Sequence, residues 1–134
     1  MTVSYDVLVE RATRGYRFLA SDEGKRLGFD VNLLNPDTID LSSACCCALG
    51  QTYEMGSYWN AIERLADEGY PVVTTDDAWD VELDRDNRSL VYAWERQHGF
   101  IATRGDNPSP LRSFAQLTDA WREVIKRERD LEAV

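Results

Sequence analysis

Apolar residues recur every three or four positions in several stretches of the chain, which is the spacing of one face of an α-helix. The first stretch runs from Ser4 to about Ala20, and its apolar residues are Tyr5, Leu8, Ala12, Tyr16 and Leu19. Four charged residues lie mostly between them: Glu10, Arg11, Arg14 and Arg17. We predict an amphipathic helix here. Residues 21–37 contain glycine, asparagine and proline, so they predict a loop from which four apolar side chains pack on the core: Leu27, Phe29, Leu33 and Leu34.

Capping residues divide the next part of the chain into two more helices. Asp40, Ser42 or Ser43 is suited to begin a helix that carries all three cysteines, because its side-chain oxygen can accept a hydrogen bond from a free backbone N–H group. Gly56 is expected to end this helix. Ser57 is suited to begin the next one, whose apolar face contains Tyr58, Trp59, Ile62 and Leu65.

The second half of the chain predicts two further helices and one short β element. Residues 72–84 begin with strand-forming residues and then alternate apolar with acidic ones, which favours a short β-hairpin. A helix ended by Gly99 follows, and the last helix begins at a capping box formed by Ser113 and Gln116. The pattern predicts a mainly helical, compact single domain of four to five helices that spans residues 1–134.

The net charge of the chain indicates which kinds of partner to expect. The 134 residues carry a formal net charge of −9, and no cluster of lysine and arginine is present. Nucleic-acid binders use such clusters to neutralise phosphates, so nucleic acid is not an expected partner. Most of the negative charge is local, because residues 63–86 contain nine acidic side chains and two arginines, a balance of −7. A basic surface of another protein is the partner that this segment favours.

Within this acidic segment, the candidates for binding a partner are five acids, Asp76, Asp77, Asp80, Glu82 and Asp84. A solvated acidic surface without a partner is the alternative. The longest apolar run, from Ala44 to Leu49, is far too short to span a membrane, which needs about 20 residues. The N-terminus also lacks the features of a secretory signal. We therefore predict a cytoplasmic protein with no membrane partner, and the oligomeric state stays open.

Three adjacent cysteines, Cys45, Cys46 and Cys47, are the most conspicuous candidates for chemistry. Successive side chains of a helix point about 100° apart, so the three thiols cannot converge on one ion. Cys45 and Cys46 fall on the apolar face of the predicted helix, which predicts that they are small core residues. Cys47 falls on the side of Gly50, whose missing side chain would let another helix or a ligand approach the backbone.

A thiol-dependent enzyme or a redox-responsive protein is an alternative that the cysteines leave open. A thiol in the first turn of a helix is stabilised as a thiolate by the helix dipole, which makes Cys47 or Cys45 a candidate nucleophile. Gln51 and His98, the one histidine of the chain, are the candidate supporting groups. No complete catalytic constellation is evident, so the leading prediction is a protein without enzymatic activity.

The spacing of possible ligands does not favour a metal site. Tetrahedral zinc sites use spaced cysteine pairs such as C-x2-C, and this chain has none. Aligned with the calcium-binding loop of an EF-hand, residues 84–95 place Arg88 where an oxygen ligand belongs and Ser89 where the turn glycine belongs. We predict neither a metal nor a cofactor.

Three segments also match a pattern of motifs: IDLSSACCCALGQTYEMGSYWNAI (Ile39–Ile62), HGF (His98–Phe100) and LTDAWREVIKRER (Leu117–Arg129). In this order they resemble a family of small uncharacterised proteins of actinobacterial bacteriophages and prophages, whose pattern is LDLSS-x-x-x-C-x-LGQ-x-Y, then GF, then LT-x-AWR. The matching residues are Leu41, Ser42, Ser43, Cys47, Leu49, Gly50, Gln51, Tyr53, Gly99, Phe100, Leu117, Thr118, Ala120, Trp121 and Arg122. Because most of them are apolar, small or capping residues, the resemblance implies a fold signature.

Acidity, small size and the resemblance together predict a phage-encoded accessory protein that acts by protein–protein interaction. The expected partner is a host factor in the cytoplasm of the host cell. A virion or assembly component is a further alternative.

Overall fold

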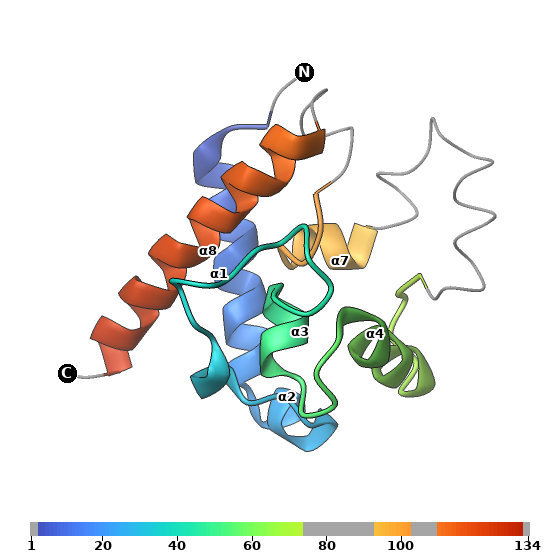
Figure 1. Ribbon diagram of the computed structural model, residues 1–134. Helices are drawn as coiled ribbons and strands as arrows, with labels where there is room; N and C mark the ends of the chain where they lie inside the picture. The colour runs from blue at the N-terminus through green and yellow to red at the C-terminus, as the bar shows by residue number, and fades with distance from the viewer. Residues whose placement is uncertain (1–2, 74–92, 103–109, 133–134) are drawn as a thin grey trace.

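The computed structural model describes residues 3–73, 93–102 and 110–132 (Figure 1). In these residues the chain forms six α-helices and one 3₁₀ helix, and no β-strand. The prediction of a mainly helical, compact single domain is confirmed. The elements are α1 (Tyr5–Ala20), α2 (Asp22–Leu27), η1 (Val31–Leu33), α3 (Ala48–Thr52), α4 (Tyr58–Asp67), α7 (Ala93–Gln97) and α8 (Pro110–Glu132).

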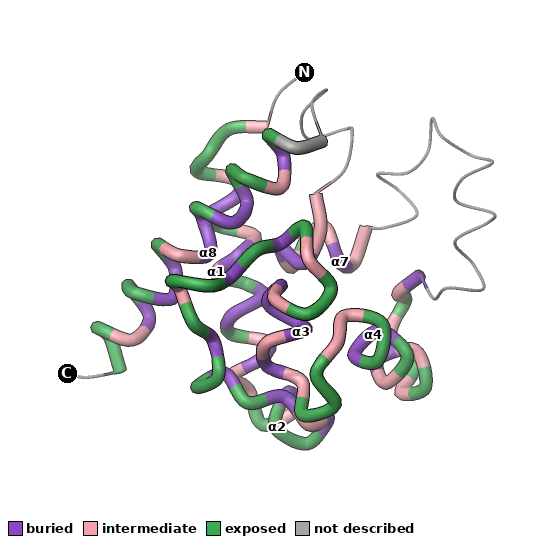
Figure 2. Tube along the Cα trace, viewed as in Figure 1, coloured by how far each residue is buried: buried purple, intermediate pink, exposed green. Residues whose placement is uncertain are grey.

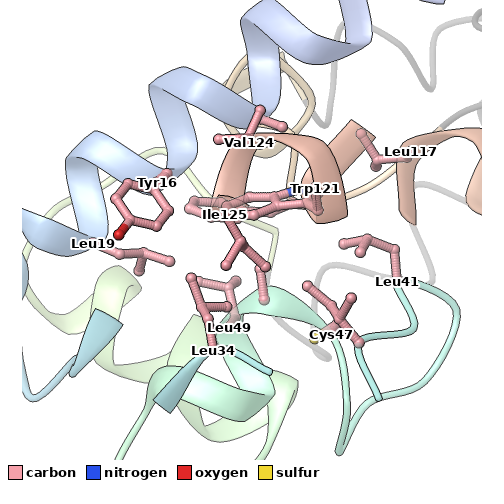
Figure 3. Packing of buried hydrophobic residues seen from close by; sticks show 14 of the residues in the cluster. Tyr16, Leu19, Leu34, Leu41, Cys47, Leu49, Leu117, Trp121, Val124 and Ile125 are labelled. Carbon is pink, nitrogen blue, oxygen red and sulfur yellow. The ribbon is translucent and has the colours of Figure 1, made fainter. Parts of the chain in front are cut away.

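The first and last helices, α1 and α8, pack side by side and form the centre of the core (Figure 1). The apolar face predicted for α1 is buried from Leu8 to Leu19, whereas Tyr5 at its start is 44% exposed. Burying a large apolar side chain contributes about 1.5–3 kcal/mol. The contact between the two helices is therefore a major source of stability. The large, fully buried side chains of α8 are those of Leu117, Trp121, Val124 and Ile125 (Figure 3).

A turn at residues 98–100 is held between these two helices. Trp121 of α8 donates its indole N–H to the carbonyl oxygen of Gly99 at 2.6 Å. Gly99 has a φ of +68°, a left-handed conformation that glycine adopts without strain. On α1, Gly15 lies so close to the turn that a Cβ atom there would collide with the carbonyl oxygen of His98. A missing side chain on α1 and a tryptophan on α8 thus fix the position of the turn.

Residues 21–28, predicted as loop, contain the short helix α2. The side chain of Ser21 caps its first turn, and Gly28 ends it with a φ of +103°. The helix was missed because its one large apolar residue, Leu27, gives no helical periodicity. Leu33, expected on the core, is 54% exposed, and the other three apolar residues of the predicted loop are buried as expected: Leu27, Phe29 and Leu34.

The helices α4, α7 and α8 agree with the predicted order, with differences at their ends. Ser57 caps α4 as predicted, its Oγ accepting from the N–H of Asn60 at 3.1 Å. α7 ends before Gly99 as predicted. α8 begins at Pro110, before the expected capping box at Ser113. Proline suits the first position of a helix because its missing N–H would have no partner there.

The predicted hairpin at residues 72–84 lies outside the described residues from position 74 onward. Val72 and Val73, its first two residues, are not part of a strand. Val73 is buried, and the partly buried Val72 packs against the hydrophobic core.

We predict that Gly15→Ala lowers the free energy of unfolding by about 1–3 kcal/mol, because the added methyl group collides with the His98 carbonyl oxygen and approaches the Trp121 ring. At an exposed helical glycine, the same substitution by alanine would raise the free energy of unfolding by roughly 1 kcal/mol. Urea unfolding followed by tryptophan fluorescence measures the change. Glu10→Ala, at an exposed position of α1, is the control and should change stability by less than about 0.5 kcal/mol. A stabilising Gly15→Ala would contradict this packing.

Candidate functional site

The cysteine segment is a series of turns and not a helix. The side-chain Oδ1 of Asp40 accepts a hydrogen bond from the N–H of Ser42 at 3.0 Å, and the carbonyl oxygen of Ser43 accepts one from the N–H of Cys46 at 3.2 Å. Helix α3 begins only after Cys47. The prediction that one helix carries all three cysteines is therefore wrong. An aspartate side chain that bonds to the nearby backbone, as that of Asp40 does, favours a turn over a helix, which accounts for the difference.

The three thiols lie in different environments. Cys45 is exposed, Cys46 is half-buried and Cys47 is only 2% exposed. The expectation that Cys45 and Cys46 are the core residues is wrong, because Cys47 is the one that lies in the core, near Leu41 (Figure 3). Burial raises the pKa of Cys47 to about 11, so this thiol is protonated at neutral pH.

Cys47 has a structural role at the start of α3. Its Sγ accepts a hydrogen bond from the N–H of Gly50 at 3.3 Å and so caps the helix. Gly50 in turn lies against the cysteine turn, where a Cβ atom would collide with the carbonyl oxygen of Ala44 and would lie 2.9 Å from that of Cys45. The space beside Gly50, expected to admit another helix or a ligand, is filled by the chain's own backbone.

Gln51 links α3 to the loop that precedes the cysteines. Its Oε1 accepts a hydrogen bond from the N–H of Asn35 at 3.0 Å, and its Nε2 donates one to the Oγ1 of Thr38 at 3.1 Å. Both ends of the amide are therefore used in holding this loop.

His98 lies among aromatic rings at the end of α7. It stacks on Trp94 with ring centroids 4.2 Å apart, and its Nδ1 is 2.8 Å from the carbonyl oxygen of Trp94. Burial lowers the pKa of His98, so its ring is neutral at neutral pH. Among the described residues, no hydrogen bond joins any two of the candidate catalytic groups, which are Cys47, Gln51 and His98.

The residues of the phage-family pattern connect the cysteine segment to α8. The Oγ1 of Thr118 accepts a hydrogen bond from the N–H of Leu41 at 3.0 Å. The Nε of Arg122 donates to the carbonyl oxygen of Pro36 at 3.0 Å. These bonds join residues more than seventy positions apart in the chain, so these parts of the pattern act as a scaffold.

One face of α4 is exposed next to the cysteine turn. The N–H of Tyr58 donates to the carbonyl oxygen of Ala44 at 2.8 Å, which ties the helix to the turn. Met55, which precedes the helix, is 65% exposed, and Trp59, the second residue of the helix, is 43% exposed. The ring of Tyr58 meets that of Trp59 edge-on, with centroids 5.1 Å apart. Large apolar side chains thus remain accessible at this end of the helix.

Acidic residues continue the same face of α4. Figure 2 shows exposed stretches along this helix. Glu63 and Asp67 follow Trp59 at intervals of four residues, which places them on one side of the helix, and both are exposed. No basic side chain among the described residues pairs with either of them, whereas the nearby Glu68 pairs with Arg26 at 3.1 Å and with Arg64 at 2.7 Å. We refer to Met55, Trp59, Glu63 and Asp67 together as the α4 face.

The five acids predicted to bind a partner lie outside the described residues: Asp76, Asp77, Asp80, Glu82 and Asp84. The α4 face belongs to the described part of the chain and includes the first two acids of the same acidic segment. The exposure of Met55 and Trp59 was not anticipated, since Trp59 was placed on the buried face of its helix.

Glu95 on α7 is a buried carboxyl group that the sequence analysis did not single out. Its exposed fraction is 0%, and within the described part of the chain no side chain pairs with either carboxylate oxygen. Removal from water raises the pKa of Glu95 to about 8, so the group is largely protonated at neutral pH. The sequence does contain a signal. The apolar face that it predicts for this helix consists of Leu90, Val91, Trp94 and His98, and Glu95 lies four residues after Val91 on the same side.

Comparisons with protein-family models, curated proteins and solved structures found no match to this chain. In the parts of the chain that the structure describes, no group of three histidine, cysteine or acidic side chains is arranged to hold a metal ion. None of the described helices is both long enough and apolar enough to cross a membrane.

We predict that Glu95 makes the protein less stable as the pH rises from about 4.5 to about 8. The unfolded chain loses the proton of this carboxyl group near its ordinary pKa, whereas the folded chain retains it until about pH 8, so ionisation favours unfolding in this range. Glu95→Gln removes the titration. The difference in unfolding free energy between the variant and the parent should increase by up to about 1.4 kcal/mol per pH unit.

Urea unfolding at about pH 5 and about pH 8 measures this difference. Gln97→Ala, at an exposed position of α7, changes no titratable group; it is the control and should leave the pH dependence unchanged. Parallel pH profiles of the parent and Glu95→Gln would contradict the burial of this group.

Proposed function

We propose that this chain is a small acidic accessory protein, of the phage-encoded kind that its sequence resembles, and that it acts by binding a basic surface of a host protein. The observation on which the proposal rests is the α4 face. There, two exposed apolar side chains, Met55 and Trp59, continue directly into the exposed acids Glu63 and Asp67.

The two parts of this face suit different aspects of protein recognition. Tryptophan is enriched among the few interface residues that supply most of the binding energy, because it buries a large area in a partner's pocket. Charged groups around such an anchor steer the partner during approach and select its orientation. Trp59 supplies the anchor, and Glu63 and Asp67 supply charge of one sign.

The helix that carries the face is firmly held on its other side. Ile62 and Leu65 are fully buried, and Ser57 caps the first turn. A surface that is already in its bound conformation loses less conformational entropy when a partner binds. The rigidity of α4 therefore favours binding.

We propose that the acids that follow α4 in the sequence also contribute to binding the partner. The segment from Glu63 to Asp86 has a balance of −7, so a partner that contacts α4 also meets a strong negative potential. The partner expected from this combination has lysine and arginine around an apolar pocket. Its binding should weaken as salt increases.

Site-specific cross-linking tests this proposal. Asn60, exposed beside Trp59, is replaced by a photo-reactive phenylalanine analogue, and the protein is irradiated in an actinobacterial cell extract. The same group at Lys126, an exposed position of α8, is the matched control. We expect a discrete cross-linked host protein from position 60 that unlabelled parent protein competes away, and none from position 126.

Variants of the face then measure its contribution to the affinity for the captured protein. Trp59→Ala should raise the Kd by about tenfold or more. Joint neutralisation of Asp76, Asp77, Asp80, Glu82 and Asp84 should slow association and reduce its salt dependence. Leu33→Ala, which removes a side chain that is 54% exposed elsewhere, should leave the Kd unchanged. Equal cross-linking at both positions, or a Kd unaffected by Trp59→Ala and by the neutralised acids, would contradict the proposal.

A further inference from the structure

One side of α1 remains accessible beside α8. A hollow of about 460 Å³ lies there, and α1 lines it with Asp6, Val9, Glu10, Thr13, Arg14 and Arg17. We refer to these six residues as the α1 face. Arg127 of α8 also lines the hollow and pairs with Glu123 at 3.5 Å. All four charged residues of the α1 face are exposed, so another molecule can reach them.

The charges on the α1 face are ordered along the helix. Asp6 and Glu10 lie in the first half of α1, whereas Arg14 and Arg17 lie in the second half. Steps of four and three residues keep all four on one side of an α-helix. Their charges cancel, although the whole chain has a net charge of −9. A second copy of the chain therefore meets less repulsion at this face than over acidic parts of the surface.

The ion pairs that these groups make within one chain are loose or leave the side chains accessible. Among the described residues, no basic side chain pairs with Asp6. Arg14 and Glu10 are 3.9 Å apart, and their side chains are 48% and 71% exposed. Arg17 bonds through its Nε to Glu128 at 3.0 Å, yet its side chain is 68% exposed. Exposed ion pairs contribute little to stability, so contacts with a second molecule can compete with them.

We propose that the α1 face binds the α1 face of a second copy of this chain, with the two helices antiparallel. A two-fold axis that crosses the face between Glu10 and Thr13 relates the two copies. It places Asp6 of each copy opposite Arg17 of the other, and Glu10 of each copy within one residue of Arg14 of the other. Because the copies are related by symmetry, each of these contacts forms twice.

The same charge order disfavours the other arrangement of the two helices. In a parallel pair, Asp6 would lie opposite Asp6 of the second copy, and Arg17 would lie opposite Arg17. Like charges placed opposite each other oppose association and select against a wrong orientation. The charges on the α1 face therefore specify the antiparallel pair.

The dimer is expected to be reversible. The α1 face belongs to a single helix of 16 residues, and interfaces of small area are typical of weak or transient complexes. At its centre, Thr13 has a short side chain, which favours a close approach of the two helices. The α1 face shares no residue with the α4 face, so this proposal does not depend on the function proposed for α4.

Complementary charge reversals test the proposal, with sedimentation velocity of the full chain over a series of concentrations as the readout. We expect the parent protein to form dimers as its concentration rises. Asp6→Arg and Arg17→Glu should each lose dimer formation at concentrations at which the parent dimerises, because each variant places like charges at both contacts. An equimolar mixture of the two variants should dimerise again, since each new charge then faces an opposite charge on the other chain.

Control variants separate this contact from general effects of charge. Lys25→Glu and Asp22→Arg make the same changes in charge at exposed positions of α2 and should dimerise like the parent. Circular dichroism and tryptophan fluorescence show whether each variant retains the fold.

A further variant avoids the possible loss of stability in Arg17→Glu, which places a second acid beside Glu128. Asp6→Arg combined with Arg17→Gln removes the repulsion without adding an acid, so it should dimerise more than Asp6→Arg alone. A parent that stays monomeric up to its solubility limit, a dimer that Asp6→Arg leaves intact, or a mixture of folded reversal variants that stays monomeric would overturn the proposal.

Discussion

The hydrogen bond from Trp121 to the backbone of Gly99, made inside the contact of α1 with α8, is the constraint on which the other positions in the fold depend. A buried carbonyl oxygen needs a partner, and the fully buried indole supplies it where the absence of a side chain at Gly15 lets the turn approach α1. With α8 fixed in this way, Thr118 and Arg122 hold the backbone that leads into the cysteine turn. Helix α8, near the end of the chain, thus positions the cysteine turn in its middle.

The cysteine segment has one side that is buried in the fold and stabilises it, the structural side, and one that is exposed, the accessible side. On the structural side, Cys47 caps α3, and Gly50 lies directly against the backbone of Ala44 and Cys45. Outward, Cys45 is exposed, and the turn is bonded to the first residue of α4, next to Trp59. Residues that identify the phage-like pattern lie mostly on the structural side. The proposed binding surface lies on the accessible side.

Long periodic helices were predictable, and short irregular segments were not. α1, α4 and α8 have apolar residues at helical spacing, and clear caps mark the first two, so local sequence specifies them. The cysteine segment has a helix-like composition, but hydrogen bonds accepted by the Asp40 side chain and the Ser43 carbonyl oxygen form turns instead. As a result, Cys47 is buried and Cys45 is exposed. The exposed Trp59 was missed because burial depends on tertiary contacts, which periodicity alone does not reveal. The acidity of the candidate surface followed directly from composition.

Hydrogen exchange of the Trp121 indole N–H, followed by NMR in the intact chain, tests the central constraint most directly. A proton held in a buried hydrogen bond exchanges only when the structure opens. We expect the Trp121 indole proton to exchange at the rate of global unfolding and to show NOE contacts to Gly99 and Gly15, while that of the exposed Trp59 exchanges rapidly. An indole proton of Trp121 that exchanges as fast as that of Trp59, without these contacts, would contradict the account.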